Sequence, residues 1–466
     1  YRTYMTGKWH LGHDEGQLPA DHGFDKSFLL DASGADNWEQ KPYLPYYRTA
    51  PWFEGHKPAK LPDDFYSSRF IVDKMIDYLG TEQAGSKPFF AYLAFMAVHI
   101  PVQAPKEYTD NYKDTYTQGW QSIRESRWQR AQTLGLIPQG AKMAPPPETL
   151  DVWDWEALPP ETRALEARKL AVNAGMLEAM DHELGRFIDH LKQTGQYDST
   201  VFVVTSDNGP EAGDPVESPI APWLRLTGYN WDIETLGEKG SYVAIGPDWA
   251  QAASGPSHLF KFHSSEGGLR VPLIISGPGI PASGRIEAFT VMTDVAPTLL
   301  DLASVDKSPP DVLPMTGRSL LPLITGHSDS VYTPEEPIGI ETSGQVALYR
   351  GDYKLVRAMP PHGDGIWRVF NIALDPGETN DLSATHPQLM ISLMKDYRDY
   401  ADRVGVLELP EGYQVERQIT HNIVAKIVEF YWGWLLIICL VALVIGITFL
   451  WGLWKTTIWI FKSVLR

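Results

Sequence analysis

A run of 25 residues near the C-terminus, residues 430–454, carries no formally charged side chain. About 20 apolar residues suffice to cross the hydrocarbon core of a bilayer, and Trp stands at both ends of this run, as it does at membrane interfaces. The run predicts a single C-terminal membrane span rather than a buried core helix. The cations beyond it, Lys455, Lys462 and Arg466, predict a cytoplasmic tail and a periplasmic or extracellular body.

The body is acidic and has the composition of a folded protein. Of the 466 residues, 43% are hydrophobic and 21% are charged, which is typical of a globular chain. The formal net charge is -18, and this argues against a nucleic-acid partner, because phosphate backbones need a basic face. The only cysteine, Cys439, lies inside the apolar run, so the chain has no internal disulfide and no cysteine-based zinc site.

Before the apolar run, the sequence alternates between strand and helix patterns. Residues 88–95 and 200–206 are short β-rich apolar runs that predict buried parallel strands, and residues 271–279 are a third buried-strand candidate. Between the first two, after Pro159 and Pro160, apolar residues recur at helical spacing. A helix that precedes a buried strand in this way is typical of the βαβ units of an α/β fold.

Three further segments complete the predicted organisation. Residues 106–160 form a long, Trp-rich insertion, which we expect to be irregular and to shape a pocket. From about residue 336 the period shortens, as in VALYRGDYKLVR, which predicts hairpin strands. We therefore expect an α/β domain at 1–335, a smaller antiparallel-sheet (α+β) subdomain at 336–415, and a juxtamembrane segment with the membrane helix at 416–466.

The cluster GKWHLGH at residues 7–13 is the first that carries chemistry. Lys8 and His10 stand two residues apart, so an extended backbone would point both side chains to one face. A cation would then lie beside an acid/base group. The alternative is a solvated loop, in which lysine and histidine are common.

Asp207 and Asn208 come directly after the 200–206 run, where open parallel sheets bind ligands at the carboxyl ends of their strands. Their side-chain oxygens suit a hard cation such as Ca²⁺ or Mg²⁺. An ordinary Asp-Asn-Gly turn has the same pattern, and the residues alone do not separate the two.

Two more residues are site candidates by position. His99 follows the 88–95 run, either as a site residue or as a core histidine whose ring bonds to the backbone. Lys261 precedes Glu266-Gly267-Gly268, and those glycines allow close backbone approach. The alternative for Lys261 is a surface lysine before a turn.

Taken together, these segments resemble the sulfatases of the alkaline-phosphatase superfamily. The pattern Y-x-T-x-x-x-G-K-W-H-L-G, which starts at Tyr1, is that family's second signature, and A-V-H-x-P, T-S-D-N-G and K-x(4)-E-G-G follow in the family's order. TDVAPTLLDLA and FNIALDPGETNDL resemble its later landmarks. The resemblance covers residues 1 to about 405 apart from the insertion, and it implies an alkaline-phosphatase-like mixed sheet flanked by helices.

The resemblance also implies roles for the candidate residues. Lys8 and Lys261 resemble the lysines that neutralise sulfate oxygens, which is electrostatic stabilisation of the transition state. His99 resembles the proton donor to the leaving alcohol, and His10 resembles the group that assists breakdown of the sulfated intermediate. The substrate implied is a sulfate ester.

The same resemblance implies two cofactors. In such enzymes a formylglycine, made from cysteine or serine, is the nucleophile, and a divalent cation, usually Ca²⁺, polarises the sulfate; Asp207 and Asn208 resemble two of its ligands. The C/S-x-P-S-R motif and the N-terminal Asp-Asp pair of the family occur nowhere in this sequence. We expect that the chain begins after them, that the full-length protein needs a formylglycine-generating enzyme, and that this chain alone is inactive.

Two alternatives stay open. One is a phosphatase or phosphonate monoester hydrolase of the same superfamily, although S-D-N-G argues against the two-zinc version, which would need histidines near the metals. The other is a membrane-tethered, catalytically inactive binding protein. The substrate is also open, because aromatic residues in the loops can hold a leaving group or serve as core or surface filler: Trp120, Trp128, Trp223, Tyr229 and Trp231.

Overall fold

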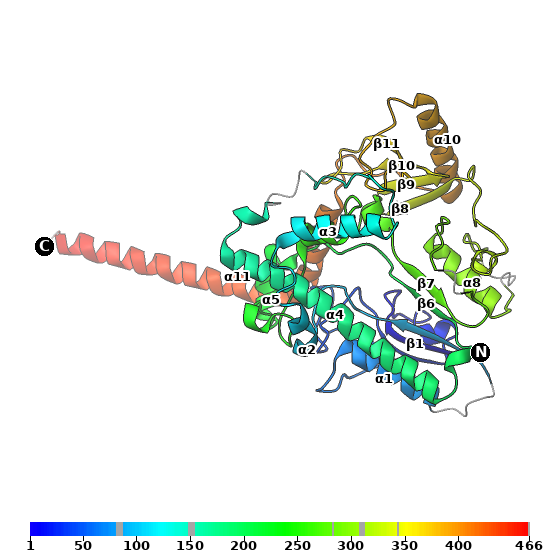
Figure 1. Cartoon of the computed structure of the whole chain (residues 1–466). Helices are drawn as coiled ribbons and strands as arrows, with labels where there is room; N and C mark the ends of the chain where they lie inside the picture. Colours follow the sequence, from blue (N-terminus) through cyan, green and yellow to red (C-terminus); the bar gives the residue numbers. More distant parts are fainter. Residues whose placement is uncertain (81–86, 148–153, 282–283, 307–312, 343, 465–466) are drawn as a thin grey trace.

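The computed structural model describes residues 1–80, 87–147, 154–281, 284–306, 313–342 and 344–464. Residues 148–153 of the predicted insertion and Arg466 of the predicted tail lie outside the described residues. Within the described part, a body of sheets and helices is followed by one long helix that leaves it (Figure 1).

A five-stranded sheet forms one half of the body, in the order β4-β3-β2-β1-β5. β1 is parallel to both β2 and β5, whereas β3 and β4 are added antiparallel. The strands are β1 (Arg2–Lys8), β2 (Lys26–Leu30), β3 (Trp52–Glu54), β4 (Lys57–Pro58) and β5 (Phe89–Ala94). Because β1 and β5 are parallel neighbours, the residues that follow both strands lie at the same edge of the sheet.

Two helices cover one face of this sheet, α1 (Ser67–Gly80) and α4 (Pro160–Gln193). Met75 of α1 and Phe187 of α4 lie in one buried cluster with Tyr4 and Phe28 of the sheet. The predicted helix after Pro159 is therefore confirmed as α4, which begins at Pro160. Proline is well tolerated there because the first helical N–H has no partner in the helix.

The prediction for residues 88–95 is right in pairing and wrong in burial. β5 pairs parallel with β1, but alternate side chains on it are open to solvent, with Phe90 36% and Tyr92 45% exposed. The reason lies in the strand order, since β5 is the last strand of its sheet in the described part of the chain.

The prediction of a buried parallel strand at 200–206 is wrong in pairing and in burial, and the prediction of a buried strand at 271–279 is wrong in burial. β6 (Phe202–Thr205) and β7 (Leu273–Ser276) pair antiparallel in a two-stranded sheet of their own. Val204 is 39% exposed and Ile274 is 60% exposed. Both runs are strands as expected, but the described chain places no strand between β6 and β5 to cover them.

A four-stranded antiparallel sheet follows in the order β11-β10-β9-β8. Its strands are β8 (Ile338–Thr342), β9 (Gln345–Arg350), β10 (Tyr353–Arg357) and β11 (Trp367–Asn371), and α10 (Pro387–Val404) packs on it. The predicted hairpin is confirmed by the antiparallel pair β9 and β10. The domain boundaries at 335 and 415 stay predictions.

The insertion is more regular than its sequence suggests. It contains α2 (Lys106–Thr109) and α3 (Gly119–Thr133), so the expectation of an irregular segment is wrong. α3 forms because Trp120 packs edge-on against Trp155 and Trp249 in the largest buried cluster. The other short α-helices of the described chain are α5 (Ala221–Leu226), α6 (Gly246–Ala253), α7 (Glu266–Leu269), α8 (Val295–Leu302) and α9 (Leu321–Ile324).

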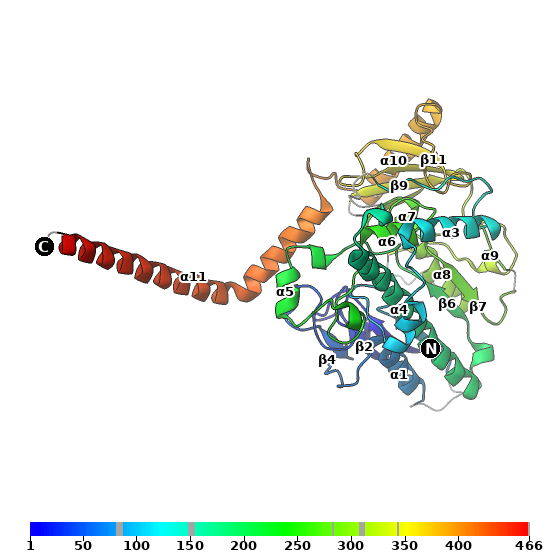
Figure 2. The ribbon, with the colours of Figure 1, turned by 60° about the vertical axis from the view of Figure 1, so that its left-hand side comes forward.

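The chain continues in α11 (Val415–Val464), a helix of 50 residues. Figure 2 shows that it bends and then extends away from the body. Within it, Leu436–Ile458 is long and apolar enough to cross a membrane by length and composition, with a mean hydropathy of 2.8 and no part buried inside the body.

Candidate active site

One large cavity of about 2350 Å³ lies between β5 and β6. All six residues singled out from the sequence line it: Lys8, His10, His99, Asp207, Asn208 and Lys261. They come from four separate segments of the chain, which the fold brings to one place.

Lys8 and His10 reach the cavity by a different route from the one expected. Lys8 is the last residue of β1, but His10 has a left-handed backbone with φ of 58°, so the two do not share a face of one extended strand. Burial lowers the pKa of Lys8, and Lys261 lowers it further while Asp207 acts in the opposite direction. Burial also lowers the pKa of His10, with Lys8 as the next cause. His10 is therefore neutral at neutral pH.

Gly7 allows the approach that sets this edge of the sheet. It has a φ of +108°, and a Cβ there would lie 2.0 Å from the Ala94 carbonyl oxygen on β5. Any side chain at this position would push β1 and β5 apart. Lys8 and the segment after β5 are thereby held close together.

His99 is both a buried histidine and a cavity residue. Its Nδ1 lies 2.7 Å from the Ile100 carbonyl oxygen, to which the protonated nitrogen donates, and the side chain is 14% exposed. Burial lowers the pKa of His99 to about 4, and the cations Lys261 and Lys8 add to this effect. The free Nε2 lies 4.0 Å from a Glu211 oxygen. The ring is therefore oriented by the backbone, with Nε2 available for proton transfer.

Glu211 is the residue that the sequence reasoning missed. Its Oε2 lies 2.7 Å from Nζ of Lys261, so one carboxylate faces both the lysine and His99. Burial alone would raise the pKa of Glu211, but Lys261 and His99 lower it overall. The sequence held one signal for it: Glu211 is the next acidic residue after Asp207, in the same loop.

Asp207 and Asn208 follow β6 in a loop that packs against the glycines of α7. The Gly209 N–H donates to the Gly268 carbonyl at 3.0 Å, and a Cβ on Gly209 would lie 1.9 Å from the Gly267 carbonyl oxygen. This packing fixes the loop. The carboxylate and amide oxygens fit a hard cation. However, among the described residues no group of three or more His, Cys, Asp or Glu side chains is arranged to hold a metal. Asp207 and Asn208 would therefore supply only some of the ligands of a metal ion.

A buried charge network connects the cavity to the C-terminal sheet. Lys354 of β10 is fully buried between Glu266 at 2.9 Å and Glu378 at 2.8 Å. The Tyr349 hydroxyl donates to the same Glu266 carboxylate at 2.8 Å. Because Glu266 begins α7, five residues after Lys261, the C-terminal sheet holds the segment that presents this lysine to the cavity.

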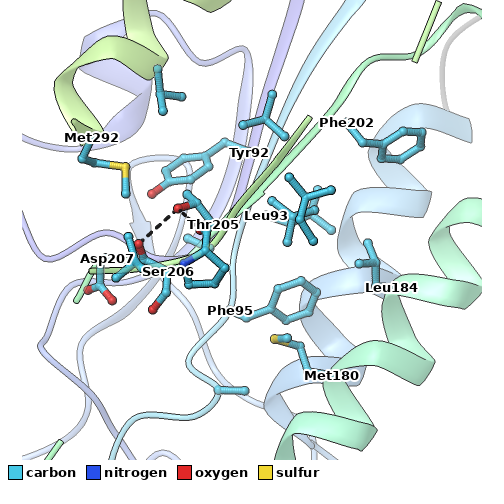
Figure 3. Close-up of a pocket in the computed structure, with 18 of the residues that line it drawn as sticks. Tyr92, Leu93, Phe95, Met180, Leu184, Phe202, Thr205, Ser206, Asp207 and Met292 are labelled. Atoms are coloured by element: carbon cyan, nitrogen blue, oxygen red, sulfur yellow. Dashed lines mark hydrogen bonds between the residues drawn. The ribbon is translucent and has the colours of Figure 1, made fainter. Parts of the chain in front are cut away.

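The rest of the cavity is an apolar slot between two strands. All residues of β5 and β6 line it, with α4 behind them. Figure 3 shows Tyr92, Leu93 and Phe95 on the β5 side, and Met180 and Leu184 on the side of α4. A six-residue strand such as β5 is about 20 Å long, so the slot has the length of a β-strand.

The aromatic loop residues do not contribute to this cavity. Trp120, Trp128, Trp223, Tyr229 and Trp231 are absent from its lining. Trp120 and Tyr229 belong to the buried core. From the described residues of the insertion, Ala131, Leu136 and Ile137 reach the cavity, where they form part of an apolar wall.

Comparison with known proteins identifies the family. The family model for sulfatases matches residues 1–305. The chain belongs to the sulfatase family. This sulfatase is 33% identical over 430 residues to an uncharacterized sulfatase of Schizosaccharomyces pombe, covering 89% of this chain and 77% of the relative. It is 36% identical over 337 residues to an arylsulfatase of Klebsiella aerogenes, covering 69% of this chain and 70% of the relative.

Solved structures agree on the fold of this sulfatase. The crystal structure of Ps i-CgsB in complex with k-i-k-neocarrahexaose has a TM-score of 0.55 at 20% identity, covering 86% of this chain and 71% of that one. The structure of a protein in complex with its substrate D-glucosamine-2-N,6-O-disulfate also has a TM-score of 0.55, at 18% identity, covering 89% and 82%. These structures support the predicted alkaline-phosphatase-like mixed α/β fold. The sulfatase relatives support sulfate ester hydrolysis as the general activity.

Proposed function

We propose that this chain forms most of the active site of a calcium-dependent sulfuric ester hydrolase of the arylsulfatase type. The observation that supports it is the gathering of two lysines, two histidines, an aspartate and an asparagine from four segments into one cavity. Lys8 and Lys261 both lower the pKa of the buried His99, so both cations act on the same part of the cavity. An anionic substrate group is stabilised by such a pair of cations.

Lys8 and Lys261 bind the oxygens of the sulfate group in this proposal. The bond between sulfur and the leaving oxygen breaks, both electrons stay on that oxygen, and the alcohol takes a proton from Nε2 of His99. In the free site burial keeps His99 neutral, and the two lysines add to this effect. An anionic ester between them offsets their effect, so binding raises the pKa of His99 toward the range of a proton donor. His10, which is neutral, accepts a proton when the sulfated intermediate breaks down.

Asp207 and Asn208 would hold Ca²⁺ through two of its six to eight oxygen ligands, and the cation would polarise a sulfate oxygen. A formylglycine, made from cysteine or serine by a formylglycine-generating enzyme, would supply the attacking oxygen. We assign it to a strand that fills the slot between β5 and β6, because in the described part of the chain both strands expose apolar side chains and unpaired edges along this slot.

Turnover of aryl esters tests the proposal. The chain alone should not hydrolyse an aryl sulfate, because losing the nucleophile costs about 10⁶ in turnover when groups act as a unit. Adding a segment with C-x-P-S-R and Asp-Asp, together with the formylglycine-generating enzyme, should give calcium-dependent turnover of the sulfate. Faster turnover of the matching aryl phosphate would instead indicate a phosphatase. Calcium-dependent turnover by the chain alone would show that the nucleophile lies within it.

Variants of the restored enzyme test the two lysines. Lys8→Met or Lys261→Met should lower turnover by about 10²–10³, as the loss of one preorganised group that stabilises charge typically does. Lys239→Met is the control, because Lys239 is 53% exposed and pairs with Glu39 rather than with the cavity. Equal activity of all three variants would remove both lysines from the mechanism.

We also propose that α11 crosses a membrane once, with the body outside the cytoplasm. The helix contains the apolar stretch Leu436–Ile458, and the cation Lys455 lies close to its end. Protease added to intact cells or spheroplasts should degrade the body and leave the C-terminal tail. A body that stays protected until lysis would contradict this topology.

A further inference from the structure

The body touches α11 just before its apolar stretch. Arg48 donates a hydrogen bond to the Phe430 carbonyl oxygen at 3.2 Å, and its guanidinium lies 5.5 Å from the centroid of the Phe430 ring. Ile423 of α11 is only 8% exposed, as expected for a side chain that packs against the body. The helix is therefore in contact with the body rather than attached by a free linker.

The position of this contact along α11 determines how far the body lies from the bilayer. Phe430 precedes the stretch Leu436–Ile458 by six residues, which is about 9 Å along a helix. The headgroup layer on each side of a bilayer is roughly 5–8 Å thick. If α11 crosses a bilayer, the surface around Arg48 therefore lies at about the outer edge of the headgroups.

α5 lies on the same side of the body. In both views it is beside the bend of α11, on the side from which the helix leaves (Figures 1 and 2). Leu226 at its end is 87% exposed, and Ile233 shortly after it is 37% exposed. Leu224 and Tyr229 are buried at 0% and 3%, so they hold this segment firmly on the core. A single exposed leucine is ordinary on a soluble surface, but this one ends α5, the helix that lies beside α11.

The neighbouring side chains are of types that are frequent at membrane interfaces. The Arg225 guanidinium lies 4.0 Å from the centroid of the Trp231 ring. Tryptophan and arginine beside an exposed aliphatic residue are typical of segments at the headgroup level. Asp232 and Glu234 are exposed here as well, so the segment has no excess of positive charge. A zwitterionic bilayer therefore fits it better than an anionic one.

We propose that residues 221–233 are a second membrane contact, in which Leu226 inserts into the headgroup region of the bilayer that α11 crosses. This inference rests on the proposed membrane span. Its consequence is that the body sits on the bilayer in one orientation instead of swinging on a single helix. The cavity is then held at a constant height above the lipid.

Site-directed fluorescence tests this contact, because Cys439 is the only cysteine of the chain. The full chain is reconstituted in phosphatidylcholine vesicles with one environment-sensitive label. The label is placed on Cys439 itself, or on Leu226→Cys or Ile391→Cys in a Cys439→Ser background. Ile391 is the matched control, since it is 59% exposed on α10, away from the outgoing part of α11 (Figure 1).

The label at residue 226 should shift its emission to the blue and be quenched by lipids that carry a spin label near the headgroup. The label at residue 391 should do neither, and the label on Cys439 should be quenched by a spin label deep in the acyl chains. Emission at 226 that matches 391, with Cys439 quenched, would overturn the second contact and leave the span intact. Failure of Cys439 to be quenched would overturn both.

Discussion

The buried network around Lys354 gives a stability prediction that can be worked from the structure. Lys354 is fully buried, with Glu266 and Glu378 at 2.9 and 2.8 Å. Burial alone would lower the pKa of Lys354, but the two carboxylates raise it. Lys354 in turn overcomes the effect of burial on Glu266 and lowers the pKa of that carboxyl to about 2.

Lys354→Met keeps the apolar stem and removes the charge, so Glu378 loses its partner cation, whereas Glu266 retains Arg270, whose Nε lies 2.9 Å from its carboxylate. Breaking a buried ion pair in this way costs about 3–5 kcal/mol, because the remaining charge is uncompensated. At about 2 °C per kcal/mol for a large domain, Tm should fall by about 6–10 °C. Because the pKa of Glu266 is depressed, its contribution is present above the ordinary carboxyl pKa and lost as the pH falls toward 2. The loss in the variant should therefore be largest at neutral pH and smaller in acid.

Two comparisons make this prediction refutable by thermal unfolding. Lys395→Met removes an exposed i,i+4 pair with Asp399 and should leave Tm nearly unchanged, because solvent screens such a pair. Lys354→Met with Glu378→Gln should be more stable than Lys354→Met alone, because one of the two buried charges is gone. A Tm for Lys354→Met equal to that of Lys395→Met, or no recovery in the double variant, would refute the reasoning.

Three other variants follow from local geometry. Burial raises the pKa of Asp248 to about 7 from an ordinary 3.8, so its contribution to stability is full below pH 3.8 and is lost as the pH rises through 7. Asp248→Asn should therefore raise Tm at pH 8 and not at pH 4. The gain in the free energy of unfolding at pH 8 is at most about 4 kcal/mol. An equal shift at both pH values would contradict this. Gly209→Ala should destabilise the protein, since its Cβ would lie 1.9 Å from the Gly267 carbonyl oxygen; an unchanged Tm would refute the tight packing. Glu211→Gln should tighten sulfate binding measured by calorimetry, because Lys261 loses its anionic partner at 2.7 Å; weaker binding would show that Glu211 positions the lysine.

Much of this structure is readable from the sequence where the signal is local. The helix that begins at Pro160 has both a start signal and a long apolar period, and the β9–β10 hairpin has short alternating runs around Gly351. The six candidate residues were found from their motifs and lie in one cavity. Such features depend on neighbours close in the chain, so the sequence alone identifies them.

The features that were missed depend on distant partners. α3 has few apolar residues, and it forms because Trp120 meets Trp155 and Trp249, which come later in the chain. Glu211 has meaning only through Lys261, which lies 50 residues further along in sequence and 2.7 Å away in space. His10 reaches the cavity by a left-handed turn that no side-chain periodicity indicates. Sequence patterns report burial and local period, but not which remote segments meet.

The failed expectation of burial on β5 and β6 is informative for the same reason. Apolar runs at 88–95 and 200–206 predict strands with protein on both faces, yet Tyr92 and Val204 are 45% and 39% exposed. The two exposures occur on opposite walls of one cavity, and each wall is a strand with a free edge in the described chain. A strand placed between them would satisfy the backbone groups of both edges and bury the apolar side chains that the sequence pattern says should be buried. If it ran parallel to β5, its carboxyl end would also lie where Lys8, His99 and Asp207 already converge. The disagreement between pattern and structure thus points to the same location as the chemistry of the site.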